Sequence, residues 1–249
     1  MKTRTLFVAL IIFAISLSSC SVLSNTGVRV ITPSKTIISE NRDVSSYNAI
    51  NFATFGKVNI IQGDKESLNI SGPDNLVPEI TTTVSNGTLT IKTKENITVT
   101  SLLAENMLTF TIVVKDLSSL VISGAGDVQV DMLSAPSLDL TMSGAGKVRV
   151  NQLTTDTLKV NISGAGGLEI SGSATQATID IPGAGGISAQ DLKVQTANIT
   201  ISGLGSATLW VTDQLTGSIS GAGSVSYYGS PQANTNSTGL GQFKPLGNK

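Results

Sequence analysis

A short glycine motif recurs seven times along the second half of this 249-residue chain. Six copies carry two glycines separated by one residue, and a seventh copy follows at Thr238–Gly241. The first glycines of successive copies lie 18 to 20 residues apart. The six glycine pairs are Gly124 and Gly126, Gly144 and Gly146, Gly164 and Gly166, Gly183 and Gly185, Gly203 and Gly205, and Gly221 and Gly223. A fixed period of this length is typical of repeat architectures.

Apolar and polar residues alternate on both sides of each motif, which is the period of a β-strand. Apolar residues occupy the position two before the first glycine: Ile122, Met142, Ile162, Ile181, Ile201 and Ile219. A unit of about 20 residues cannot bury its apolar face alone, whereas stacked units bury a continuous column. The sequence therefore predicts an all-β protein, a right-handed parallel β-helix or β-solenoid with coils of about 20 residues and Gly-x-Gly corners.

The corner glycines have two predicted roles. A sharp corner favours backbone with positive φ, which glycine adopts readily. Corners that stack directly on one another also leave no room for a side chain. Stacking by one coil further predicts neighbours of opposite charge on the outside: Asp127 over Lys147, Asp139 over Lys159, and Arg149 beside Glu169.

The first residues of the chain have the pattern of an export signal. Lys2 and Arg4 precede an apolar run, Leu6–Leu17, that is too short to span a bilayer comfortably. The run ends in Leu-Ser-Ser-Cys20, and Cys20 is the only cysteine. This pattern resembles a bacterial lipobox, so we expect residues 1–19 to be a lipoprotein signal peptide and Cys20 to be the lipid attachment site. An ordinary signal peptide with a stray cysteine is the alternative.

Five regions follow from these patterns. After the signal peptide, residues 20–40 form the lipidated cysteine and a polar tether. Residues 41–118 form irregular N-terminal β coils, in which Asn86-Gly87 predicts a hairpin. Residues 119–230 form the regular solenoid, and residues 231–249 form a C-terminal cap or tail. One elongated solenoid is preferred over two β lobes.

The composition excludes most catalytic and metal chemistry. The chain has no histidine and one cysteine, which removes Ser-His-Asp and Cys-His machinery and multi-cysteine metal sites. Its formal net charge of −1 gives no basic footprint for nucleic acid. Repeat-type calcium sites need an acid in every copy, and only Asp127 stands at that place. We therefore predict no catalytic residue, no metal, no cofactor and no nucleic-acid partner.

Two aromatic residues are candidate ligand contacts. Trp210 and Tyr228 fall on the outward phase of their strands, where a ring can stack on a sugar or contact a partner. Burial under the tail or a neighbouring chain explains them equally well. Tyr227 falls on the inward phase and is expected in the core.

Charged residues of the early coils leave an enzymatic alternative open. Carbohydrate-cleaving β-helices use clustered carboxylates with an arginine or lysine base. The candidates are Asp127, Asp131, Asp139, Glu169 and Asp180, with Lys147 and Arg149. Solvated charges on the outside of the coils explain the same residues. A structural component that assembles through its solenoid ends is a third hypothesis.

The order of segments resembles a known family. The chain is similar to the head GIN domain family of Bacteroidetes envelope proteins in Arg42-Asp43-Val44, in the runs Tyr47–Ile50, Val58–Gly63, Leu68–Asn75 and Val84–Ile91, and in the serial glycine corners that follow. The resemblance covers residues 42–230 and implies a β-helical fold, a cell-envelope location and an adhesin-type role, with no catalytic motif to carry over. The resulting hypothesis is a non-enzymatic, lipid-anchored envelope protein that binds a surface glycan or protein.

Overall fold

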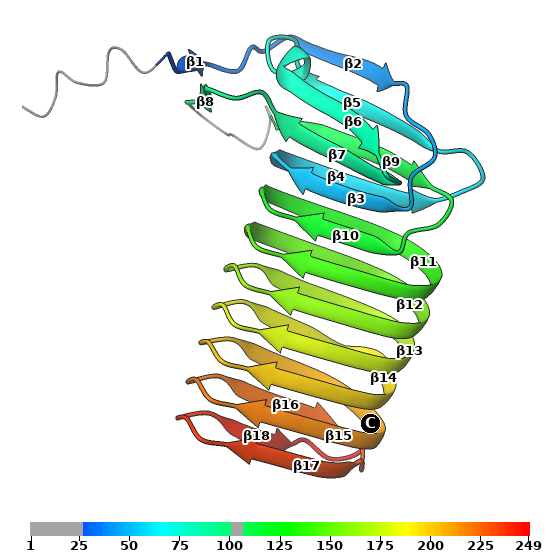
Figure 1. Ribbon diagram of the computed structural model, residues 1–249, viewed down its shortest axis with the longest axis vertical. Coiled ribbons are helices and arrows are strands. Elements are labelled where there is room, and N and C mark those ends of the chain that lie inside the picture. The colour runs from blue at the N-terminus through cyan, green and yellow to red at the C-terminus, as the bar shows by residue number, and fades with distance from the viewer. Residues whose placement is uncertain (1–26, 101–106) are drawn as a thin grey trace, which may run out of the picture.

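The computed structural model describes residues 27–100 and 107–249. Nearly all of its regular structure is β, and the strands wind into a solenoid of about 6 turns with coils of about 20 residues. Figure 1 shows the coils stacked along one long axis, with the last coils at the end opposite the N-terminal strands. The predicted fold class is confirmed.

Five long strands form the regular part of the stack. They are β11 (Ala125–Met142), β12 (Ala145–Ile162), β13 (Gly167–Ile181), β14 (Gly186–Ile201) and β15 (Ser206–Ile219), and each pairs in parallel with the next. Each strand turns on the side of the stack away from the corners, so that its first part and its last part lie on two opposite walls (Figure 1). The Gly-x-Gly corner joins one coil to the next, and we call the bend within each strand the far bend.

The core lies between the two walls. Residues at one phase of the alternation are buried and align in columns from coil to coil, as the sequence predicts. One such column contains Val128, Val148, Leu168, Ile187, Ala207 and Val225. Burial of these stacked side chains is the dominant favourable term in the stability of the solenoid.

The corner glycines are explained by close packing and not by backbone strain. Of the twelve corner glycines, Gly146 alone has a positive φ, at 144°. The expectation of left-handed backbone is therefore wrong for the other corners. At the first glycine of each pair, a backbone carbonyl oxygen of the preceding coil points at the Cα instead: a Cβ on Gly144 would lie well within 3.0 Å of the Gly124 oxygen. At four of the six second glycines, a Cβ would first meet a core side chain, that of Phe52, Met142, Ile162 or Ile181. Consecutive corners approach through their backbones, and any side chain there would separate them.

The N-terminal strands continue the stack and then close it. They are β1 (Arg29–Ile31), β2 (Ile37–Arg42), β3 (Ala49–Ala53), β4 (Phe55–Gln62), β5 (Ser67–Pro73), β6 (Ile80–Ser85), β7 (Thr88–Thr93), β8 (Ile97–Val99), β9 (Thr109–Val114) and β10 (Ser119–Ile122). β3 pairs in parallel with β10, and β4 with β11, so the solenoid register passes into this region. β2, β5 and β9 pair antiparallel, and β6 and β7 form the predicted hairpin at Asn86-Gly87. The added strands cover the end of the core.

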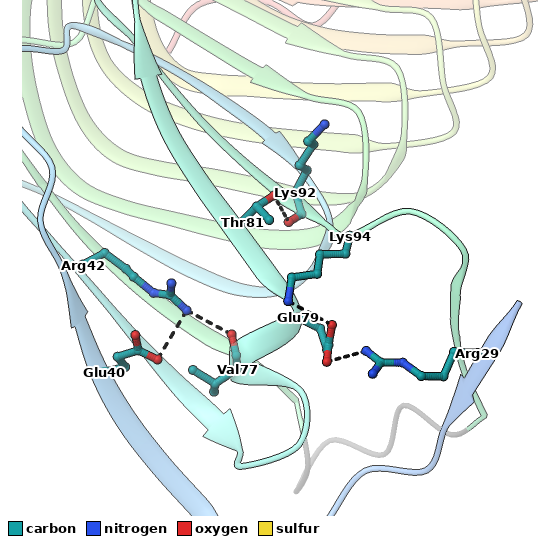
Figure 2. A network of polar contacts seen from close by, with 8 residues as sticks. All are labelled: Arg29, Glu40, Arg42, Val77, Glu79, Thr81, Lys92 and Lys94. Carbon is teal, nitrogen blue, oxygen red and sulfur yellow. Dashed lines mark hydrogen bonds and ion pairs between the residues drawn. The ribbon is translucent and has the colours of Figure 1, made fainter.

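Two polar networks hold this end together (Figure 2). Glu79, at the end of the 3-10 helix η2 (Val77–Glu79), pairs with Arg29 of β1 and with Lys94, whose Nζ lies 3.4 Å from the carboxylate. The hydrogen bond from Arg29 is the main reason that the pKa of Glu79 is lowered. Beside it, Arg42 donates to the carbonyl of Val77 at 3.1 Å. The networks fasten β1 and β2 to η2.

The C-terminal segment adds one further coil. β16 (Ser224–Tyr228) is followed by β17 (Gln232–Ser237) and β18 (Gln242–Pro245), which pair in parallel with β15 and β16. The ring of Phe243 lies where a Cβ on Gly217 would stand, so the two residues fit together at the end of the core. Residues 231–249 are thus the last layer of the stack.

Tyr47 supplies a test of the N-terminal packing. Its single hydroxyl proton is shared between the carbonyls of Val113 at 2.7 Å and Ser67 at 3.3 Å, and burial raises its pKa to about 12. Because the folded pKa lies above the ordinary value of 10.0, its contribution to stability is complete below pH 10 and is lost as the pH rises through about 12. The absorbance of phenolate at 295 nm, compared with that of Tyr47→Phe, should show this delayed titration. An ordinary titration of Tyr47 in folded protein would contradict the described packing.

Candidate functional site

One outward-facing file of residues runs along the far bend through six coils. Register pairs link its members one coil at a time: Ser134, Thr154, Ser173, Lys193, Trp210 and Tyr228. The first four side chains are exposed and the two aromatic ones are half-buried. We call this set the outer strip. Neighbouring coils of a parallel sheet are about 4.8 Å apart, so the six residues span about 24 Å.

A groove lies along the first four coils of the outer strip. It has a volume of about 470 Å³ and is open to solvent. The polar residues that line it are Ser134, Thr154, Thr155, Asp156, Ser173, Thr175, Lys193 and Gln195. Hydroxyl groups predominate, so the groove offers both donors and acceptors to a polar ligand.

The local sequence explains why these side chains point outward. The next residue in each of these coils points inward and is buried: Ala135, Thr155, Ala174 and Val194. Thr155 is tolerated there because its hydroxyl donates to the Thr157 carbonyl at 3.2 Å. At the N-terminal end, the Gln62 side chain accepts from the backbone N–H of Ser134 at 2.9 Å and donates to its carbonyl at 3.0 Å. Gln62 therefore marks where the outer strip begins.

A bulge in β14 interrupts its pairing with β15 at the far bend. Ala189 pairs with Leu209, but the next pair is Lys193 with Trp210. Gln190, Asp191 and Leu192 consequently have no partner in β15. A bulge re-aims side chains and is common near functional sites. Here it places the Asp191 carboxylate and the Gln190 carbonyl near Trp210, close enough for Lys249 to contact all three.

The two predicted ligand contacts lie side by side at the C-terminal end of the outer strip. Trp210 pairs in register with Tyr228, and both rings are half-buried. Lys249 Nζ lies 5.3 Å from the centre of the Trp210 ring and 5.8 Å from that of Tyr228. Lys193 Nζ lies 5.9 Å from Trp210. The outward phase agrees with the sequence analysis, and part of the tail also lies over the rings. Tyr227 packs against the core but is only partly buried.

Lys249 makes its polar contacts on the bulge. Its ammonium group donates to the Asp191 carboxylate and to the Gln190 carbonyl. The hydrogen bond from Lys249 lowers the pKa of Asp191. None of Lys193, Asp191 and Lys249 was singled out by the sequence. The shortening of the glycine period from 20 to 18 residues is the one signal that could have indicated the bulge.

The charged residues considered for catalysis do not converge. Asp127, Asp131 and Glu169 lie on the first part of their strands, while Asp139 and Asp180 lie on the last part, on the opposite wall. The predicted registers of Asp127 with Lys147, Asp139 with Lys159 and Arg149 with Glu169 are confirmed. Lys147, however, pairs through its side chain with Glu169, and Asp127 accepts from the Lys147 backbone N–H at 3.2 Å.

Glu169 is bound by two cations. Lys147 and Arg149 both pair with it, Arg149 at 2.8 Å, and the hydrogen bond from Lys147 is the main cause of its lowered pKa. A carboxyl group with a lowered pKa stays ionised near neutral pH and is poorly suited to donate a proton. This cluster joins adjacent coils and carries no sign of general-acid chemistry.

Several further observations concern the membrane and metals. Cys20, the predicted lipid attachment site, lies outside the described residues. Through residues 27–100 and 107–249, no helix has the length and apolar character needed to cross a bilayer. In the same ranges, no three acidic or thiol side chains gather closely enough to hold a metal ion.

Known proteins resemble this chain in sequence and in shape. Residues 46–231 match the family described as "Putative auto-transporter adhesin, head GIN domain". The crystal structure of a putative adhesin from Bacteroides fragilis NCTC 9343 is 30% identical with a TM-score of 0.82, and the match covers 87% of this chain and 100% of that one. A search of curated proteins finds no match.

Two more distant structures show the same fold. A putative adhesin from Parabacteroides merdae ATCC 43184 is 21% identical with a TM-score of 0.70, over 87% of this chain and 99% of that one. A putative lipid binding protein from Parabacteroides distasonis ATCC 8503 is 21% identical with a TM-score of 0.71, over 88% and 100%. At this identity the likeness concerns the fold alone.

Proposed function

The chain belongs to the family described as "Putative auto-transporter adhesin, head GIN domain", and we propose that it is a non-enzymatic binding module that holds a surface glycan along its outer strip. The observation that carries this proposal is the single register file joining the hydroxyl-lined groove to Trp210 and Tyr228. A ligand that follows this file meets hydroxyl groups first and aromatic rings at the end.

The spacing of the outer strip suits an extended ligand. Hydroxyl groups recur in three successive coils, at Ser134, Thr154 and Ser173, about 4.8 Å apart, so a linear polymer can repeat the same weak contact along this part of the strip. Hydroxyl groups can exchange hydrogen bonds with sugar hydroxyls, and an aromatic face can pack against the apolar face of a sugar ring. A compact ligand would use one part of the strip and leave the rest empty.

The proposal includes attachment to the bacterial envelope. The lipobox-like sequence ending at Cys20 supports acylation of that residue, and acyl chains hold a soluble domain at a membrane surface. A solenoid tethered by lipid would expose the outer strip to the surroundings of the membrane along the whole length of the stack. The adhesin-type family agrees with a location in the envelope or on the surface.

Replacing the two aromatic residues should weaken glycan binding. We expect Trp210→Ala and Tyr228→Ala each to reduce affinity for a polysaccharide identified on a glycan array by about tenfold, because each removes a stacking surface. Thr216→Ala is the matched control, since Thr216 is exposed on the opposite wall of the same strand, β15. Surface plasmon resonance with the immobilised polysaccharide measures the effect. Equal affinities for all three variants and the unsubstituted protein would contradict the proposed site.

A further inference from the structure

Lys249 occupies a built site at the aromatic end of the outer strip. The chain reaches it by continuing the last coil: the Leu246 N–H donates to the Tyr227 carbonyl at 2.7 Å, and the Gly229 N–H to the Gly247 carbonyl at 2.9 Å. Ser230 then donates to the Asn248 side chain at 2.8 Å. Residues 246–249 therefore form an ordered strap, and the strap brings the Lys249 ammonium back to β14 and β15.

The groups around that ammonium supply hydrogen-bond acceptors and aromatic faces. An ammonium has three N–H donors and no acceptor. The Asp191 carboxylate and the Gln190 carbonyl accept from it, and the Trp210 and Tyr228 rings lie 5.3 and 5.8 Å away. Aromatic faces within about 6 Å attract a cation through their electron-rich π systems. Four groups from three segments thus surround one side-chain nitrogen.

The site does not need Lys249 in order to exist. Trp210 and Tyr228 are fixed by their register in β15 and β16, and the bulge in β14 fixes Asp191 and Gln190. Lys249, in contrast, lies on an exposed segment that follows β18. The paired strands therefore form the site, and the exposed segment after β18 supplies its occupant.

We propose that the aromatic end of the outer strip is a binding site for a primary ammonium group on the external ligand, and that Lys249 fills this site from within the chain until the ligand displaces it. The exchange replaces one ammonium by another, so the Asp191 carboxylate stays paired and Lys193 faces the same charge as before. The inference rests on the proposed function because it names the chemistry at one end of the same strip. An amino sugar and a lysine side chain both supply such a group.

The proposal predicts competition between Lys249 and the ligand. A ligand that binds only when the strap is open has its apparent affinity reduced in proportion to the open fraction. Removing the Lys249 ammonium should therefore tighten binding of small amines. Trp210 is the only tryptophan in this sequence, so the intrinsic fluorescence of the protein reports occupancy of this site directly.

The experiment titrates three proteins with defined probes. Unsubstituted protein, Lys249→Ala and the control Lys244→Ala, which removes a lysine from β18, are each titrated with N-acetyl-lysine methylamide, with glucosamine and with the uncharged N-acetylglucosamine. We expect Lys249→Ala to bind at least one of the two amines about tenfold more tightly than the other proteins, and to show no such gain for N-acetylglucosamine. The amine that gains identifies the source of the ammonium group. Adding Asp191→Asn to Lys249→Ala should reverse the gain.

The outcomes separate this inference from the proposed function. If Lys249→Ala binds neither amine more tightly than Lys244→Ala does, or if Asp191→Asn leaves the gain intact, the ammonium site is overturned. Polysaccharide binding that depends on Trp210 would still stand in that case. Tight amine binding by Lys249→Ala together with no polysaccharide binding by any protein would support the site and overturn the proposed glycan ligand.

Discussion

Gly144→Ala is expected to destabilise the protein by about 3 kcal/mol, more than most single substitutions cost. The added Cβ would lie well within 3.0 Å of the Gly124 carbonyl oxygen, which belongs to the backbone of the preceding coil. No side-chain rotation can relieve this overlap, so two coils must separate at the corner. Thermal denaturation should show a fall of about 6–12 °C in the melting temperature.

Gly167→Ala is the matched control for that substitution. Gly167 directly follows the second glycine of a corner, Gly166. A Cβ on Gly167 would meet no atom within 4 Å, and the φ of Gly167 is not in the left-handed region. Alanine should therefore be neutral or slightly stabilising, because it reduces the entropy of the unfolded chain. If both substitutions lowered the melting temperature equally, glycine would be needed for a reason other than the stacking of corners.

Phe110→Ala is expected to cost about 4 kcal/mol, in the range measured for removal of a buried aromatic ring. Phe110 lies on β9 with no exposed surface, and its ring packs edge-to-face on Phe52 with centroids 5.1 Å apart. Gly56 and Gly126 leave the space that the two rings fill, since a Cβ at Gly56 would lie 3.0 Å from the Phe110 ring. The cavity would therefore join several coils.

Chemical denaturation followed by circular dichroism measures this effect, and hydrogen exchange locates it. The loss of protection should begin in β3, β4 and β9, because contacts in a solenoid are mainly between neighbouring coils. Leu240→Ala is the control: Leu240 is 93% exposed, so its removal should change stability by less than about 0.5 kcal/mol. A large effect at Leu240 would indicate a partner on that corner, and a small one at Phe110 would contradict the described core.

The regular coils were predictable because every stacked coil must meet the same packing requirements as the coil before it. Each coil places an apolar residue at the same phase, and the column from Val128 to Val225 is visible by counting from the glycines. The N-terminal region was less predictable. The Asn86-Gly87 hairpin was predictable because the turn residues themselves favour it. The pairing of β2 with β5 and of β5 with β9 was not, because it depends on contacts between segments that are distant in the sequence.

Of the two causes that the sequence analysis gives for the corner glycines, the lack of room between stacked corners is confirmed, and left-handed backbone is found at Gly146 alone. The sequence places them at corners, and the structure agrees on the position. Glycine is needed there because a backbone carbonyl or a core side chain of the neighbouring coil occupies the place of a Cβ, and not because of the dihedral angles of the corner itself. The dihedral angles of a single coil do not show this crowding, because the crowding atoms belong to the neighbouring coil.

The chain by itself determined the coil period, the inward columns and the outward phase of Trp210 and Tyr228, because alternation and repeat length are local properties of the sequence. It did not reveal that these rings share one file with Ser134, Thr154, Ser173 and Lys193. Trp210 and Tyr228 follow their first corner glycine by seven residues, whereas Ser134 and Lys193 follow theirs by ten. The bulge at residues 190–192 absorbs that difference, and only the stacking of coils aligns the file and lays Lys249 over its end. Stacking joins residues by distance in space, which a count along the chain does not measure.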